Sequence, residues 1–272
     1  MSDRIAEMFA RTRAEGRPAV IVFAPAGWPE FDATVGIVEA AVAAGADAFE
    51  LGMPFSDPLA DGVTNQEAYQ QALALGTTPV TLLANVRELR ARGVRVPLLI
   101  MGYFNPVLAY GVDRFVADAA AAGIDGLIIV DLPPGEAAEL EQPARAAGLS
   151  IVFLLAPTST DERIRAVAEH ASGFIYCVSV TGVTGARDEL PEELAAFMLR
   201  VRAASDLPLA VGFGISTRRH VEKVAAIADG AVIGSAFVRT IADGPAAERA
   251  DRIRRFLGEL SGREVGRAPV AD

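Results

Sequence analysis

The chain has 272 residues, 51% of them apolar, which suits one large α/β barrel or two small domains with a sizeable core. Its formal net charge of −10 makes nucleic acid and anionic membrane surfaces poor partners, although backbone amides can bind a phosphorylated substrate in an acidic protein. The single cysteine, Cys177, excludes an intrachain disulfide, and one cysteine with two histidines argues against a zinc site, so no metal is expected.

The N-terminal segment Met1–Glu15 is amphipathic and lacks the apolar core of a signal peptide. We expect it to form an extra helix that covers the floor of a barrel. No apolar run approaches the roughly 18 residues of a membrane helix, so we expect a cytoplasmic protein without a membrane partner.

Short apolar segments alternate with longer amphipathic ones along the chain. The short segments predict strands buried on both faces of a parallel sheet. In chain order they are Ala19–Ala24, Ala48–Leu51, Pro97–Met101, Gly126–Val130, Ser150–Leu154, Gly173–Val178, Leu207–Gly212 and Ala231–Ile233.

The longer segments predict helices, and several end at a glycine that supplies a left-handed cap. They are Phe31–Ala44, Thr78–Arg92, Val112–Ala122, Gly135–Ala147, Thr160–His170, Glu189–Ala204, Thr217–Ala228 and Ala246–Leu260.

Eight strand–helix pairs without a linker predict an α/β fold, a single (β/α)8 TIM barrel over residues 1–260 with the extra N-terminal helix. We expect the polar tail 261–272 to be frayed. A doubly wound sheet is the alternative, but the first predicted strand is followed by Pro25-Ala26-Gly27-Trp28-Pro29, which is not a dinucleotide-binding glycine fingerprint.

Active sites of such barrels lie at the carboxyl ends of the strands, and Glu50 stands at one of these ends. Burial among apolar side chains raises a carboxyl pKa, and such a group can give and take a proton near neutral pH. The alternative is a buried glutamate paired with lysine or arginine, although no basic residue stands at another predicted strand end.

The segment Pro54–Gly62 is long for a strand-to-helix connection and contains Asp57 and Asp61. Loops in this position often carry function. Asp57-Pro58 and Asp61-Gly62 are also ordinary turn sequences, so the local pattern alone favours a turn.

Glycines follow the last three predicted strands, in Thr181–Gly185, Gly212–Ser216 and Gly234-Ser235, and the last of these segments is predicted to open a further helix. The loops after the last strands form the recurring phosphate site of these barrels, because glycine lets backbone N–H groups approach the oxygens. We therefore expect phosphate binding there.

The segment Glu50–Gly62, which reads ELGMPFSDPLADG, closely resembles the signature of tryptophan synthase alpha chains. The resemblance covers nearly the whole chain. It extends to Asn105-Pro106, Asp131–Pro133, Ala156–Ser159, Gly182–Gly185, Gly212–Ile215 and Gly234-Ser235. The acidic loop is highly specific, whereas the glycine motifs are shared with many phosphate-binding barrels.

The resemblance implies roles for particular side chains. Glu50 and Asp61 match the catalytic pair of the family. Residues near the indole and glycerol parts of the substrate match Phe23, Tyr103, Asp131 and Tyr176, and a closing-loop threonine matches Thr184. The family's phosphate site matches Gly185, Gly214, Gly234 and Ser235. Val63 and Asn65 depart from the family pattern, where a proline and an aliphatic residue are usual.

The resemblance implies a lyase that cleaves indole-3-glycerol phosphate to indole and D-glyceraldehyde 3-phosphate, in an assembly of two alpha and two beta chains. It implies no cofactor on this chain, because pyridoxal phosphate belongs to the beta chain. A sugar-phosphate isomerase is a rival that the acidic loop disfavours. A free-standing indole-releasing lyase and a mainly allosteric subunit with weak activity stay open.

Overall fold

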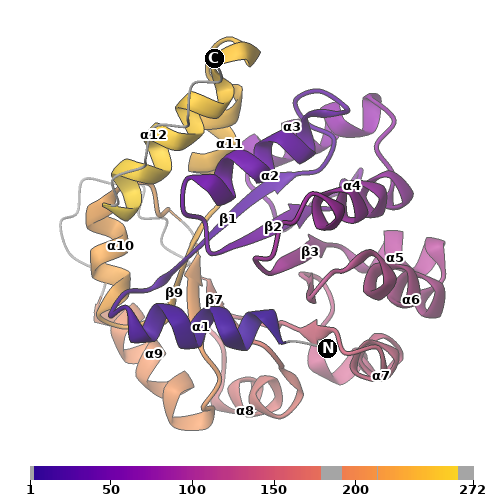
Figure 1. The fold of residues 1–272 in the computed structure, drawn as a ribbon. Coiled ribbons are helices and arrows are strands. Elements are labelled where there is room, and N and C mark those ends of the chain that lie inside the picture. Colours follow the sequence, from indigo (N-terminus) through magenta and orange to yellow (C-terminus); the bar gives the residue numbers. More distant parts are fainter. Residues whose placement is uncertain (1–2, 179–191, 213, 263–272) are drawn as a thin grey trace.

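The computed structural model describes residues 3–178, 192–212 and 214–262, and its centre is one parallel sheet of nine strands, β5-β4-β3-β2-β1-β9-β8-β7-β6. The strands are β1 (Ala19–Pro25), β2 (Ala48–Gly52), β3 (Leu98–Gly102), β4 (Gly126–Ile129), β5 (Ser150–Ile151), β6 (Leu154–Leu155), β7 (Ile175–Val178), β8 (Leu209–Gly212) and β9 (Gly230–Ile233). Figure 1 shows these strands at the centre, with the helices around them.

The two edge strands of the sheet belong to one short stretch of chain. In place of the single predicted strand Ser150–Leu154 there are two short ones: β5, which pairs with β4, and β6, which pairs with β7. The same stretch therefore joins both edges, and the sheet closes into the predicted barrel. Closure satisfies the backbone groups that an open edge would expose.

Helices follow the strands around the outside of the barrel. They are α1 (Arg4–Ala14), α2 (Ala33–Ala43), α3 (Val63–Ala74), α4 (Pro79–Ala91), α5 (Phe104–Tyr110), α6 (Val112–Ala122), α7 (Ala138–Ala146), α8 (Asp161–His170), α9 (Glu192–Ala204), α10 (Arg218–Ala225), α11 (Ser235–Ala242) and α12 (Arg249–Ser261), with 3-10 turns η1 (Pro134–Glu136) and η2 (Ala246–Glu248). Across the described ranges, none of these helices combines the length and apolarity needed to cross a membrane.

Two helices, α3 and α5, were not predicted. Helix α3 buries only Ala68, Tyr69 and Ala72, so it lacks the broad apolar stripe that marks a helix in a sequence. Helix α5 is short and contains Pro106. Of the predicted helix Glu189–Ala204, residues 189–191 lie outside the described residues, as do residues 263–272 of the predicted tail.

Helix α1 covers the floor of the barrel, as predicted. Its side chains Ile5, Met8 and Phe9 are buried inside the barrel, and the Phe9 and Phe174 ring centroids lie 5.7 Å apart. Three ion pairs attach this helix to the barrel: Arg4–Asp125 at 2.7 Å, Arg11–Asp47 at 2.9 Å and Arg13–Asp229 at 3.2 Å. Within the described residues, α1 thus covers this end of the barrel.

Candidate active site

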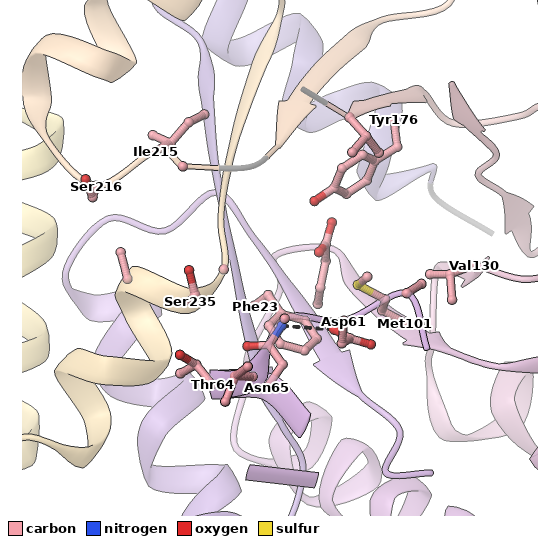
Figure 2. A pocket seen from close by; sticks show the side chains of 18 of the residues that line it. Phe23, Asp61, Thr64, Asn65, Met101, Val130, Tyr176, Ile215, Ser216 and Ser235 are labelled. Carbon is pink, nitrogen blue, oxygen red and sulfur yellow. Dashed lines mark hydrogen bonds between the residues drawn. The ribbon is translucent and has the colours of Figure 1, made fainter. Parts of the chain in front are cut away.

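A cavity of about 470 Å³ opens at the carboxyl ends of the strands. This volume suits a small-molecule ligand. Seven of the predicted site residues line the cavity together: Phe23, Glu50, Asp61, Tyr176, Gly214, Gly234 and Ser235. In Figure 2, Asp61 and Met101 lie on one side of this cavity and Ser216 and Ser235 on the other.

Glu50 lies on β2 with its side chain turned into the barrel. Side chains alternate between the two faces of a strand. Ala48 belongs to the cluster inside the barrel, whereas Phe49 and Leu51 pack outward against the helices, so Glu50 shares the inner face with Ala48. The sequence pattern therefore places a carboxyl group on the lining of the cavity.

The Glu50 side chain is fully buried, and within the described ranges neither carboxyl oxygen has a hydrogen-bond partner. The described residues thus hold no lysine or arginine paired with it, which was the alternative to a functional role. Burial in surroundings of low polarity raises the pKa of Glu50 to about 8. Below that pH the group carries a proton that it can donate.

Asp61 is held by side chains from two elements. The Tyr103 hydroxyl donates to one carboxylate oxygen at 2.7 Å, and the Asn65 amide donates to the other at 3.0 Å. The amide of Gln66 also donates to the Asp61 main-chain oxygen at 2.8 Å. Burial raises the pKa of Asp61, and the bonds from Tyr103 and Asn65 oppose that rise.

The two aspartates of the long loop differ in surroundings. Asp57 is exposed and accepts a hydrogen bond from the neighbouring Ser56 hydroxyl, as in an ordinary turn. Asp61 instead faces the cavity and contacts Tyr103, which directly follows β3. The Tyr103 hydroxyl also accepts from the Ala60 N–H at 3.0 Å.

The hydroxyl of Tyr176, on β7, points into the cavity in Figure 2, and burial raises its pKa well above the ordinary tyrosine value. A Cβ atom at Gly212 on the neighbouring strand would lie 2.3 Å from this hydroxyl oxygen. Glycine is therefore required at position 212 to leave room for the Tyr176 ring.

The opposite end of the cavity is formed by the backbone at Gly214, Gly234 and Ser235, where α11 begins. Gly214 has φ +76°, a conformation that favours glycine, and among the described residues no atom beyond its chain neighbours lies within 4 Å of where a Cβ atom at Gly234 would be. The predicted residues Thr184 and Gly185 lie outside the described residues.

Arg239 also lines the cavity and was not predicted as a site residue. It is the one lysine or arginine among the described lining residues. Long helical side chains lean toward the helix N-terminus, so a residue four positions after Ser235 lies over the start of α11. That spacing was the signal available in the sequence.

Two predicted residues, Tyr103 and Asp131, are not on the described cavity lining. Tyr103 instead contacts Asp61, and burial together with the hydrogen bond to Asp61 raises the pKa of Tyr103. Asp131 is exposed, and one of its carboxylate oxygens accepts from the Phe104 N–H at 2.9 Å, at the start of α5.

The described residues contain no group of three or more histidine, cysteine, aspartate or glutamate side chains that could hold a metal ion. Cys177 is fully buried on β7, and burial raises the pKa of its thiol to about 12. This agrees with an inert strand thiol.

A closed barrel with two acidic side chains at its carboxyl-end cavity defines the class, an α/β-barrel enzyme with a carboxyl-lined cavity. The chain belongs to the tryptophan synthase alpha chain family, whose model matches residues 9–262.

Individual relatives resemble the chain over almost its whole length. The tryptophan synthase alpha chain of Roseiflexus sp. strain RS-1 is 51% identical over 259 residues, which are 95% of this chain and 99% of that relative. A chain of Mycobacterium tuberculosis tryptophan synthase superimposes with TM-score 0.88 at 39% identity, covering 96% of this chain and 98% of that one. A chain of the Pyrococcus furiosus tryptophan synthase complex superimposes with TM-score 0.82 at 36% identity, covering 90% and 98%.

Proposed function

We propose that this chain performs the alpha reaction of tryptophan synthase, the retro-aldol cleavage of indole-3-glycerol phosphate to indole and D-glyceraldehyde 3-phosphate. The observation that carries the proposal is the cavity itself. It combines the buried, unpaired Glu50 and the hydrogen-bonded Asp61 with the glycine-bearing start of α11.

The reaction moves one proton from a substrate hydroxyl to the indole ring, and Glu50 is the proposed shuttle. Protonated Glu50 donates to indole C3, which turns the ring into a cationic leaving group. The resulting carboxylate accepts the proton of the side-chain hydroxyl as the carbon–carbon bond breaks. The bond's electron pair restores the ring, the hydroxyl becomes the aldehyde, and Glu50 regains its proton.

Asp61 is the proposed partner of the ring nitrogen. Positive charge develops on the ring after C3 is protonated, and an ionised carboxylate beside the N–H stabilises it. The two donors on Asp61 favour its ionised form, whereas Glu50 has no donor among the described residues. Two carboxyl groups in different surroundings can thus divide acid–base and electrostatic roles.

The phosphate group is proposed to bind where α11 begins. Backbone N–H groups near Gly214, Gly234 and Ser235 and the positive end of the helix dipole favour an anion there. The Arg239 guanidinium, the one positive charge among the described lining residues, adds attraction for an anion at this end.

Gly234→Asp is expected to abolish phosphate binding, because it adds a negative side chain where backbone amides must approach the ligand. Among the described residues, apart from its chain neighbours, no atom lies within 4 Å of the place that a Cβ atom would take at Gly234, so the variant should fold. Calorimetric titration with glycerol phosphate measures the effect, and Gly234→Ala is the matched control for added volume. Unchanged affinity in the aspartate variant would move the phosphate site elsewhere.

The wider context follows from the family. We propose that the chain needs no organic cofactor or metal, works in the cytoplasm and docks onto a tryptophan synthase beta chain that carries pyridoxal phosphate. Exposed apolar side chains at the barrel mouth support docking there, since Leu59 is 91% and Leu108 is 47% exposed. A beta chain that binds the catalytically competent conformation of this chain more tightly than its other conformations would raise the activity of this chain.

Indole release from indole-3-glycerol phosphate tests the function, measured while a cognate beta chain is titrated in and complex formation is followed by light scattering. We expect slow release by the chain alone and a marked rise as the complex forms. Full activity without any complex would favour a free-standing lyase. Absence of cleavage in the complex would leave a purely allosteric subunit.

A further inference from the structure

Asn65 lies in the first turn of α3, four residues after Asp61, and its side chain lines the cavity. Its amide nitrogen donates to one Asp61 carboxylate oxygen at 3.0 Å, a contact visible in Figure 2. Asp61 directly precedes Gly62, the N-cap of α3, so the bond joins the end of the loop to the first turn of the helix and is local in sequence.

The direction of the side-chain bonds that the described residues make with the Asp61 carboxylate can be assigned. The Tyr103 hydroxyl accepts from the Ala60 N–H, so its single proton is directed to Asp61. With the Asn65 NH2 group on the other oxygen, each carboxylate oxygen receives one donor. That arrangement suits an ionised carboxylate and fixes the plane of the group relative to the cavity.

The Asn65 carbonyl oxygen is buried and has no hydrogen-bond partner in the described part of the chain. Leaving an acceptor unsatisfied destabilises a fold, and an aliphatic side chain of the same size would avoid that loss. The asparagine is therefore unfavourable for stability, and its evident benefit is the N–H that it places on Asp61.

We propose that Asn65 is a positioning residue that holds the Asp61 carboxylate ionised and aimed into the cavity before substrate binds. The inference rests on the proposed role of Asp61 in the reaction. Among the described residues, the other titratable groups around Asp61 are Glu50 on β2, Tyr103 after β3, Tyr69 on α3 and Tyr176 on β7. None of these four carries a positive charge, and Arg239 lines the cavity from α11, at its other end, so hydrogen-bond donors such as Asn65 offset the burial of Asp61.

Asn65→Leu keeps the approximate size of the side chain and removes the donor. We expect kcat/KM at neutral pH to fall about tenfold, and the acid limb of the kcat–pH profile to move up by about one unit, because Asp61 then binds a proton more readily. Thermal stability should be unchanged or higher, because the unsatisfied oxygen is gone. Lost activity together with unchanged or higher stability is not expected of a merely structural residue.

Two further variants sharpen the result. Asn65→Asp keeps the shape but sets a second carboxylate beside Asp61, so its acid limb should lie higher still. Gln70→Leu makes a comparable change at an exposed position of the same helix and should match wild type. All are measured as complexes with the cognate beta chain, by indole release from about pH 5 to about pH 9.

An acid limb in Asn65→Leu at the wild-type pH, with wild-type kcat/KM, would overturn the inference. If Asp61→Asn is inactive in the same assay, the proposed function survives that result. If the wild-type complex releases no indole, the proposed function itself fails. Wild type, Asn65→Leu and Asp61→Asn, measured in the same assay, therefore distinguish failure of the Asn65 inference from failure of the proposed function.

Discussion

Glu50→Gln is expected to lower kcat for indole release by at least about a hundredfold, since acid–base groups contribute roughly 10²–10⁴-fold and this one is assigned two transfers. Glutamine keeps the size of the side chain but cannot exchange a proton. The side chain makes no bond with the described residues, so the substitution breaks none of theirs.

Glycerol phosphate binding and the melting temperature of Glu50→Gln should stay close to wild type, and Glu67→Gln, at an exposed position of α3, is the matched control. A variant that retains more than about a tenth of wild-type turnover would show that Glu50 is not the proton shuttle.

The pH dependence of wild-type kcat tests the same proposed role of Glu50. The cycle begins with protonated Glu50, whose pKa burial raises to about 8, so kcat should fall as the pH rises through that region. The loss of ionised Asp61 should lower kcat on the acid side, and the profile is then bell-shaped. Activity that keeps rising well above about pH 8 would assign Glu50 to the ionised form only.

Asp61→Asn is expected to be the second severe loss, of roughly 10²–10³-fold in kcat, because it removes the negative charge that stabilises the ring cation. The size of the side chain hardly changes. An asparagine keeps one oxygen, which can still accept from Tyr103 or from Asn65, whereas the other bond is lost because an NH2 group cannot accept it.

The rate of indole release by Asp61→Asn is measured at saturating substrate, where weakened substrate binding no longer lowers the rate. A fall in kcat then reports a lost interaction with the transition state. Asp113→Asn, at an exposed position of α6, controls for the change in net charge. A near-normal kcat for Asp61→Asn would make the loop aspartate an ordinary turn residue.

The barrel was predictable because its signals are local. Runs of buried strand residues, glycines at helix ends and the strand–helix alternation each depend on a few neighbouring residues. The predicted strands and the N-terminal helix were confirmed for that reason. Helix α3 was not predicted because its buried face consists largely of alanine, so the sequence shows no clear helical spacing of large apolar residues there.

The sequence by itself determined where acidic and glycine-bearing segments stand along the chain, and Glu50 could be placed at the cavity from its strand position alone. For Asp61 the local pattern favoured a turn, and only the family resemblance suggested otherwise. Tertiary structure decided its surroundings, because Tyr103 reaches it from 42 residues away once β2 and β3 pair in register. The unpaired state of Glu50 likewise depends on which side chains barrel closure brings near it. Periodicity encodes burial, whereas hydrogen-bond partners distant in sequence exist only after the sheet has closed.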